Sequence, residues 1–404
     1  MTVAPLDGVR ILAAEQMQAL PYGTQLLARL GADVVKVEPL TGESGRGSQP
    51  AMIDAQGRSA GATFLRNNLD KRSVAIDLRS DAGRELFLRL APKFDVVAEN
   101  FKAGAMDRLG LGYDAVAARH PAVIYVSVSG FGNRGDSPYR DWPAYSAIVE
   151  AMSGIYEFTR RPDDAPRANP VGALGDISSG LYAVIGILAA LRHRDRTGEG
   201  QHVDVAMYDA TVAMTDIVVG LGSMGMERLA FPAPMILDTF RASDGWFVMQ
   251  LVREHQFERL ARVVGHPEWI DDPRLATRAG WGEHLEDMLR PGIEGWASAH
   301  TMREAAALLT AEGVASGPCF ESHDVMTEPH LRARDMLVAL ERTDGVEQPV
   351  LVPGNPVKLS GVVETEPQPP PGLGAHTASV LQDELGLSEA EVDALAAEGV
   401  LGVS

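Results

Sequence analysis

Residues 9–37 read VRILAAEQMQALPYGTQLLARLGADVVKV, and this stretch decides the fold class. The apolar run at 9–14 predicts a buried strand, residues 18–30 carry apolar side chains at helical spacing, and 34–37 predict a second strand. Gly31 is typical of the position where such a helix ends. A strand, a helix and a strand within about thirty residues predict a parallel βαβ unit with a right-handed crossover.

The turn after the first predicted strand, residues 13–17, contains no glycine. It therefore lacks the G-x-G-x-x-G pattern that lets a dinucleotide pyrophosphate approach a helix N-terminus. This absence argues against an oxidoreductase that binds a nicotinamide or flavin dinucleotide on a Rossmann-type sheet.

Further strands alternate with helices, which predicts an α/β architecture with a Rossmann-like, mostly parallel sheet. These strands are expected at 73–78, 94–98, 123–128 and 202–206. A smaller α+β domain is expected from a strand at 245–251 and helices near 254–264, 282–298 and 301–312. The predicted domains are a large Rossmann-like domain whose first part is 1–205, a linker at 206–235, a small α+β domain at 236–328, and a returning segment at 329–404 whose C-terminal helices complete the large domain.

The composition is that of a soluble globular protein with an acidic surface. The formal net charge of −19 argues against binding to nucleic acid or to an anionic membrane. The single cysteine, Cys319, excludes an internal disulfide and a Cys-rich metal site, and no metal is expected. Neither a signal peptide nor a membrane-length apolar run is visible, so we expect a cytoplasmic protein.

A glycine-broken loop leads into a strongly apolar helix at 169–192, NPVGALGDISSGLYAVIGILAALR. Asp176 stands at the junction, where Gly172 and Gly175 allow a tight turn and the close approach of a ligand. The free backbone N–H groups at a helix start favour an ionised carboxylate. From these residues alone two interpretations stand: Asp176 caps the helix, or it takes part in catalysis.

A series of segments extends in order through nearly the whole chain. They are PLDGVRIL, LGADVVKVE, NNLDKRSVAIDL, ENFKAGAMDRLGLGYD, VSVSGFGNRG, GALGDISSG, GQHVDVAMYDA and GAHTASVLQDELGLS. In this series the chain resembles the class III CoA-transferases, a family that includes formyl-CoA and carnitine CoA-transferases and α-methylacyl-CoA racemases. The resemblance implies an enzyme whose substrate is a coenzyme A thioester and which holds no permanent cofactor.

Asp176 matches the catalytic aspartate in the G-D-x-x-x-G motif of that family. The resemblance implies covalent catalysis, in which this carboxylate attacks an acyl-CoA carbonyl and gives a mixed anhydride and CoA thiolate. The thiolate then forms an aspartyl-CoA thioester, which the carboxylate of an acceptor acid attacks. The expected function is transfer of CoA from an acyl-CoA to a free carboxylic acid.

The CoA contacts of the family carry over to three loops of this chain. They are Gln18 and Ala19 near the thioester end, Lys71, Arg72 and Ser73 near the phosphates, and Lys102 and Arg108 on a third loop. Local cations of this kind would neutralise CoA phosphates within an acidic chain.

Two features depart from the family pattern. The family often places an arginine directly after the second strand, where this chain has Pro39, and Arg46 is the candidate replacement. The glycine-rich lid of the formyl-CoA-type members has no counterpart at 225–250.

Tyr145 separates the two chemistries of the family. The racemases carry a G-H-D triplet whose histidine moves the α-proton, whereas this chain has Ala144, Tyr145 and Ser146. Tyrosine has a pKa of about 10 and is a poor general base at neutral pH. The segment PAYSAIVEAMSG most resembles the carnitine-type transferases. Tyr145 either contacts the acyl thioester or packs at a helix start. The alternatives to CoA transfer are a 2-methylacyl-CoA racemase and an inactive acyl-CoA-binding homologue.

The acceptor acid and the assembly rest on other residues. Arg160, Arg161 and Arg167 lie near Asp176 in sequence, and they either contact the acceptor carboxylate or pair with acidic neighbours on a surface loop. The resemblance implies an interlocked homodimer. An apolar linker at 214–234 and a proline-rich stretch at 367–371 fit that expectation.

Overall fold

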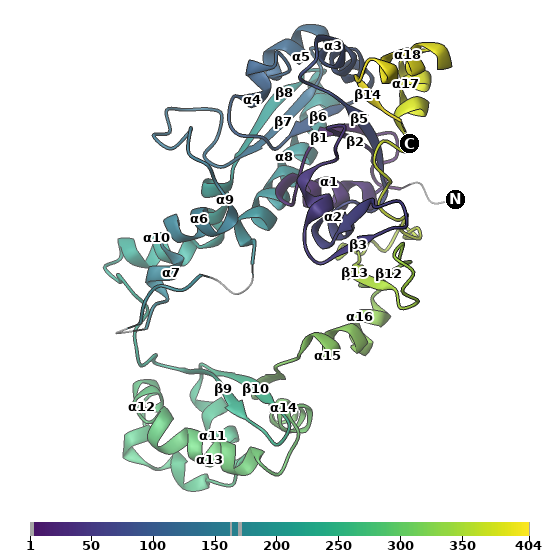
Figure 1. The fold of residues 1–404 in the computed structure, drawn as a ribbon. Helices are drawn as coiled ribbons and strands as arrows, with labels where there is room; N and C mark the ends of the chain where they lie inside the picture. The colour runs from purple at the N-terminus through teal and green to yellow at the C-terminus, as the bar shows by residue number, and fades with distance from the viewer. Residues whose placement is uncertain (1–3, 162–163, 169–171, 404) are drawn as a thin grey trace. The chain divides into compact units, whose positions relative to one another are not determined.

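The computed structural model describes residues 4–161, 164–168 and 172–403. The chain divides into two compact units, one drawn from 1–156, 168–220 and 330–404, and the other from 157–167 and 221–329. Each unit has its own sheet and its own apolar core. Figure 1 shows the helices and strands of both units.

The first unit is built on a seven-stranded sheet in the order β14-β5-β2-β1-β6-β7-β8. Its strands are β1 (Arg10–Ala14), β2 (Asp33–Glu38), β5 (Lys71–Ile76), β6 (Val96–Glu99), β7 (Ile124–Ser129), β8 (Gln201–Ala206) and β14 (Leu401–Gly402). All neighbouring strands are parallel except β14, which pairs antiparallel with β5. The predicted Rossmann-like, mostly parallel sheet is thereby confirmed.

The sheet is buried on both faces, as its continuous apolar strands require. On β1, Leu12 and Ala14 face one core and Ile11 and Ala13 face the other, and all four are fully buried. The first core includes helices α3 (Asp81–Leu90), α5 (Tyr113–Arg119), α17 (Thr377–Leu385) and α18 (Glu389–Ala397). The second core includes α1 (Ala19–Arg29), α6 (Ser146–Met152), α8 (Leu174–Thr197) and α9 (Met207–Met214) (Figure 1).

Helix α8 is the longest helix that the structure describes, and it is the only described one long and apolar enough to cross a membrane. It packs along α1, and its buried residues include Ala183, Ile187 and Ala190 in the second core. We therefore describe α8 as a core helix of the first unit.

Shorter elements are distributed over both units. Two hairpins, β3 (Ala51–Ile53) with β4 (Ser59–Gly61) and β12 (Leu337–Leu340) with β13 (Val350–Pro353), share a small apolar cluster. The remaining short helices are α2 (Ala62–Asn67), α4 (Ala105–Arg108), α7 (Ile155–Phe158), α10 (Asp216–Ser223), α15 (Ser322–Thr327) and α16 (Pro329–Ala333), with 3₁₀ turns at Ser44–Gly47 and Ala91–Lys93.

The second unit has an antiparallel sheet in the order β11-β10-β9, covered by helices. Its elements are β9 (Ile236–Arg241), β10 (Trp246–Leu251), α11 (Glu254–Val263), α12 (Arg278–Glu283), α13 (Arg290–Ala297), α14 (Met302–Ala311) and β11 (Ala315–Pro318), with 3₁₀ turns at Pro267–Ile270 and Pro273–Leu275. On β10 only the alternate residues Phe247, Met249 and Leu251 are buried, as expected of a sheet covered on one face. The helix predicted at 282–298 is divided, because a π-helical turn at Leu285–Leu289 separates α12 from α13.

Candidate active site

Asp176 lies in the first turn of α8. The helix begins at Leu174, and the N-cap position before it is Ala173, with a left-handed φ of 63°. Gly172 also has a positive φ, of 46°, which a glycine adopts without strain. Because Asp176 is the third residue of the helix, the interpretation that it is the N-cap is wrong.

Two side chains of α6, instead of Asp176, accept hydrogen bonds from the free backbone N–H groups at the start of α8. The Ser146 hydroxyl oxygen accepts hydrogen bonds from the N–H groups of Gly175 at 2.7 Å and Asp176 at 3.3 Å. Glu150 Oε1 accepts from the N–H of Gly175 at 3.2 Å and from the Ser146 hydroxyl at 2.6 Å. The Tyr156 hydroxyl donates to the other Glu150 oxygen at 2.7 Å. Glu150 is only 2% exposed, so α6 fixes the helix start through a buried carboxylate.

The Asp176 carboxyl group is held partly out of water and beside a like charge. Burial is the main reason that the pKa of Asp176 is raised to about 6. The nearby Glu150 carboxylate raises this pKa further, whereas the Arg66 guanidinium lowers it. Burial also disfavours ionised Glu150, but hydrogen bonds from Ser146, Tyr156 and backbone N–H groups keep the pKa of Glu150 below its usual value. At neutral pH Asp176 is therefore mostly ionised yet more basic than an ordinary aspartate, which suits a carboxylate nucleophile.

Close packing of α1 against α8 places a second loop beside this helix start. A Cβ added at Gly180 would lie 2.5 Å from the Ala19 carbonyl oxygen, and one at Gly23 would lie 2.7 Å from the Gly180 carbonyl oxygen. Both positions therefore require glycine, and Gly180 is the last residue of the G-D-x-x-x-G segment. Gln18 immediately precedes α1, and its Oε1 accepts a hydrogen bond from Arg66 Nη2 at 2.5 Å.

Lys71 lies in a closed group of charges that we call the buried ion cluster, composed of Glu15, Lys36, Glu43 and Lys71. Lys71 Nζ donates to Glu15 Oε1 at 2.7 Å and to Asn68 Oδ1 at 3.0 Å. Lys36 Nζ donates to the Glu15 carbonyl oxygen at 3.1 Å and lies 3.5 Å from Glu43. None of the four side chains is more than 1% exposed, and burial lowers the pKa of Lys71 to about 8. The structure thus directs Lys71 to protein oxygens, and its contact with a CoA phosphate stays a prediction.

The other predicted phosphate contacts on β5 also have protein partners. Arg72 Nη2 lies 2.6 Å from Asp33 Oδ2, although the Arg72 side chain remains partly exposed. The buried Ser73 hydroxyl donates to Glu38 at 2.6 Å, and Arg46 pairs with the same Glu38 at 2.7 Å. Arg46, the candidate replacement for the missing arginine at position 39, is therefore occupied by a carboxylate.

The loop after β6 carries two cations that face solvent. The Asn100 side chain exchanges hydrogen bonds with the backbone of Gln16, at 2.8 Å and 2.9 Å, and so ties this loop to the loop after β1. Lys102 and Arg108 are exposed, and neither forms an ion pair with any residue that the structure describes. Gln18, Lys102 and Arg108 (the last residue of α4) lie in the segments that follow the parallel strands β1 and β6, at the carboxyl ends where ligands bind in such sheets.

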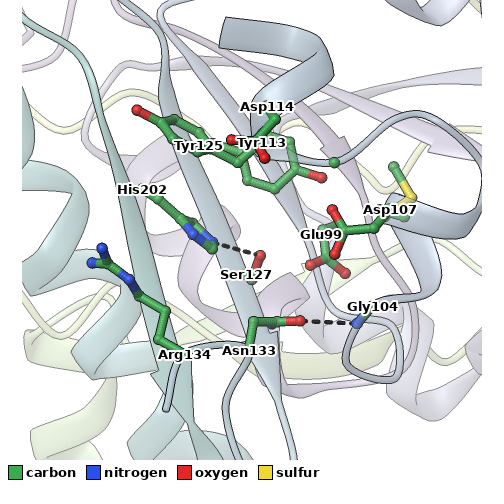
Figure 2. A pocket seen from close by; sticks show the side chains of 12 residues that line it. Glu99, Gly104, Asp107, Tyr113, Asp114, Tyr125, Ser127, Asn133, Arg134 and His202 are labelled. Carbon is green, nitrogen blue, oxygen red and sulfur yellow. Dashed lines mark hydrogen bonds between the residues drawn. The ribbon is translucent and has the colours of Figure 1, made fainter.

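A separate pocket of about 160 Å³ lies beside the loop after β6. Its lining includes Glu99, Gly104, Asp107, Tyr113, Ser127, Asn133 and His202 (Figure 2). His202 Nε2 lies 3.0 Å from the Ser127 hydroxyl, and burial raises the pKa of Glu99 to about 7. Asp176 does not line this pocket, which lies on the α5 face of the sheet, opposite the face that α8 covers.

The remaining predicted residues fall in two places. Tyr145 immediately precedes α6 and is 76% exposed, so its side chain does not pack into the core. Arg160 lies in the second unit and pairs with Glu157 at 2.8 Å, which agrees with the surface alternative for this arginine. The site residues that the sequence analysis missed are Arg66 and Glu150, because no local pattern links either of them to Asp176.

Comparison with known proteins places these features in a family. The model of CoA-transferase family III matches residues 6–377. The succinyl-CoA:mesaconate CoA-transferase of Haloarcula hispanica is 35% identical over 394 residues, which cover 95% of this chain and 96% of that protein. The formyl-CoA:oxalate CoA-transferase of Streptomyces avermitilis is 33% identical over 422 residues, which cover 98% of this chain and 99% of that protein.

Solved structures agree with this relationship. A CAIB/BAIF family protein from Brucella suis superimposes with a TM-score of 0.83 at 33% identity, covering 94% of this chain and 99% of that one. The family model and the relatives define an enzyme that transfers coenzyme A. The chain belongs to CoA-transferase family III.

Proposed function

We propose that Asp176 is the nucleophile of this CoA-transferase and carries first the acyl group and then CoA. The observation that supports the proposal most is the environment of the Asp176 carboxyl group, which is partly buried beside Glu150 at a helix start that other side chains already satisfy. Ser146 and Glu150 already accept hydrogen bonds from the helix-start N–H groups, so Asp176 is not needed to cap α8. Placing its carboxylate in this unfavourable environment therefore has no structural purpose.

The proposed reaction conserves every acyl and thiol group. Ionised Asp176 attacks the thioester carbonyl, forms an acyl anhydride and releases CoA thiolate. The thiolate attacks the aspartyl carbonyl, which gives the aspartyl-CoA thioester and releases the donor acid. The acceptor carboxylate then attacks the aspartyl carbonyl to form a second anhydride and free thiolate, and the thiolate takes the acceptor acyl group to leave ionised Asp176.

We further propose that the acids are small dicarboxylates. The relatives are named for mesaconate, D-citramalate, oxalate, glutarate and L-malate, with succinyl-CoA, acetyl-CoA or formyl-CoA as partner substrates. CoA is proposed to lie along the loops after β1 and β6, with Arg108 and Lys102 at its phosphates and Gln18 and Ala19 near its thioester.

A substrate panel tests this function. The protein is incubated with succinyl-CoA or acetyl-CoA and with succinate, glutarate, malate, oxalate or mesaconate, and new thioesters are identified by chromatography and mass spectrometry. The proposal expects a new CoA ester with at least one diacid and ping-pong kinetics. Inversion of a 2-methylacyl-CoA without CoA transfer would instead establish the racemase alternative.

A homodimer of interlocked chains is the proposed assembly. On α8 the apolar residues Leu181, Ile185 and Leu188 recur at helical spacing, and Ile185 is 59% exposed. On α10 no residue is buried, although Ile217 and Val219 are apolar. Such surfaces are typical of subunit contacts. Mass photometry over hours at nanomolar concentration should show a persistent dimer, whereas a reversible, folded monomer would contradict interlocking.

A further inference from the structure

Arg66 is a half-buried cation without a carboxylate partner. It lies in the last turn of α2, and its carbonyl oxygen accepts a hydrogen bond from Gln25 Nε2 at 2.8 Å, which anchors α2 to α1. Its guanidinium has one protein partner among the described residues, Gln18 Oε1. An arginine carries five N–H donors in a planar fork, so most of its hydrogen-bonding capacity is unused.

Comparable arginines in the same unit are paired. Arg29 lies 2.8 Å from Asp70 and 2.9 Å from Glu364, and Arg46 lies 2.7 Å from Glu38. Burial lowers the pKa of Arg66, with attraction to Asp176 as the opposing influence. A cation that loses water without gaining a carboxylate is destabilising by itself, and an anionic substrate would supply the missing partner.

The position of Arg66 limits which substrate anion it can meet. Gln18 joins Arg66 to the start of α1, and the close contact of α1 with α8 brings this pair near Asp176. Arg66 and Asp176 influence each other's pKa, yet they form no ion pair. An anion held by Arg66 therefore lies beside the reacting carboxylate, whereas the unpaired cations proposed for the CoA phosphates, Lys102 and Arg108, lie on the loop after β6.

We propose that Arg66 binds the non-reacting carboxylate of a dicarboxylic acid while the other carboxylate reacts at Asp176. This assignment rests on the proposed function. A guanidinium binds both oxygens of a carboxylate at once, which fixes the orientation of the acid. Binding the non-reacting group also leaves the attacking oxygen its full nucleophilicity, because no cation withdraws charge from it. Arg66 is thus the residue that selects diacids over monoacids of similar length.

The test compares the two half-reactions in wild type, Arg66→Gln and Arg66→Lys. Acetyl-CoA, which carries no second carboxylate, loads the enzyme, and the bound adduct is measured by intact-protein mass spectrometry. Turnover of the loaded enzyme is then measured with succinate and with propionate. In Arg66→Gln we expect kcat/KM for succinate to fall about 10- to 100-fold, as for the loss of a hydrogen bond to a charged group. Adduct formation and kcat/KM for propionate should change less than about 3-fold, and Arg66→Lys should recover part of the loss because it keeps the charge.

Arg58→Gln is the matched control, because Arg58 is exposed and pairs only with Asp54 on the β3–β4 turn. It should behave as wild type. Three results would overturn the assignment: an unchanged succinate rate in Arg66→Gln, an equal loss with succinate and propionate, or the loss of adduct formation from acetyl-CoA.

A wild-type enzyme that forms no adduct would contradict the proposed function rather than the Arg66 site. In that case calorimetry with succinate decides. Binding to wild type that is lost in Arg66→Gln supports the carboxylate site, and equal or absent binding rejects it.

Discussion

The buried ion cluster and the Asp176 site both hold carboxylates and cations out of water, but they differ in how the charges are paired. In the cluster, Lys71 and Lys36 meet Glu15 and Glu43 at hydrogen-bonding or ion-pairing distances. At the Asp176 site two carboxylates lie together and the arginine has an amide as its partner. If Asp176 is the nucleophile, as proposed, then incomplete pairing of buried charges distinguishes the reactive site from the structural cluster, whereas charge burial alone does not.

The two regions are physically linked. Glu43 Oε2 accepts a hydrogen bond from the backbone N–H of Met17 at 2.9 Å, and Met17 has a left-handed φ of 59°. Glu15 precedes this turn and Gln18 follows it. The paired cluster therefore fixes the loop that presents Gln18 and Ala19, while the unpaired site remains available to substrate.

The largest effect is expected from Asp176→Asn, which removes the proposed nucleophile and the unfavourable charge together. Turnover should fall at least about 10³-fold. The free energy of unfolding at pH 7 should rise by about 1–3 kcal/mol, since folding raises the pKa of Asp176 from 3.8 to about 6 and so disfavours the ionised form.

The sign of this stability change depends on pH. Wild type loses stability as pH rises from about 4 to 6, so the advantage of Asp176→Asn should vanish below about pH 4. Urea unfolding at pH 3.5 and pH 7 measures the difference. Normal turnover by Asp176→Asn, or equal stability of the two proteins at pH 7, would contradict the comparison.

The cluster should respond in the opposite way. Lys71→Met leaves the buried carboxylates of Glu15 and Glu43 with Lys36 as their one lysine partner in the cluster, and this excess negative charge should lower the free energy of unfolding by about 3–5 kcal/mol. Glu15→Gln combined with Lys71→Met should recover part of this loss, because no unpaired carboxylate remains. Unchanged stability with weakened CoA binding would show that Lys71 is the phosphate contact predicted from the sequence.

Arg108→Ala addresses the proposed CoA surface. Losing one exposed cation near a phosphate should weaken CoA binding by about 10-fold and leave kcat at saturating CoA ester nearly unchanged. Calorimetry with CoA measures the binding, and Arg262→Ala, an exposed arginine of the second unit, is the control. Equal dissociation constants for Arg108→Ala and the control would reject the contact.

The smallest effect is expected from Glu150→Gln, which removes the like charge beside Asp176. The proposed mechanism requires ionised Asp176, so kcat/KM for the acyl-CoA should fall as pH drops through about 6 in wild type. The substitution should lower the pKa of Asp176, so the decrease of kcat/KM at acidic pH should begin at a lower pH than in wild type. Glu85→Gln, which alters an exposed pair with Arg119, should leave the pH profile unchanged.

Much of the first unit could be predicted because its signals are local. The apolar runs and helical spacing at 9–37 define β1, α1 and β2, and Gly172 and Gly175, which precede Asp176, mark the start of α8. Strand β14 was missed because a two-residue strand gains its pairing only from β5, over three hundred residues away in sequence.

The predicted site was incomplete for the same physical reason. A sequence shows that Lys71 is a cation, but not that Glu15 lies 2.7 Å from it in the folded chain. Likewise, Glu150 and Arg66 acquire their roles only when α6, α2 and α8 assemble around Asp176. Tertiary pairing therefore decides which predicted cations remain available to a ligand.

Trapping the intermediate tests the central claim most directly. Wild type and Asp176→Asn are incubated with succinyl-CoA, treated with hydroxylamine, digested and analysed by peptide mass spectrometry. The account predicts a hydroxamate at Asp176 in wild type, formed from its anhydride or thioester, and no modified residue in the variant. A hydroxamate at another carboxylate, or turnover of succinyl-CoA and acid without modification of Asp176, would contradict it.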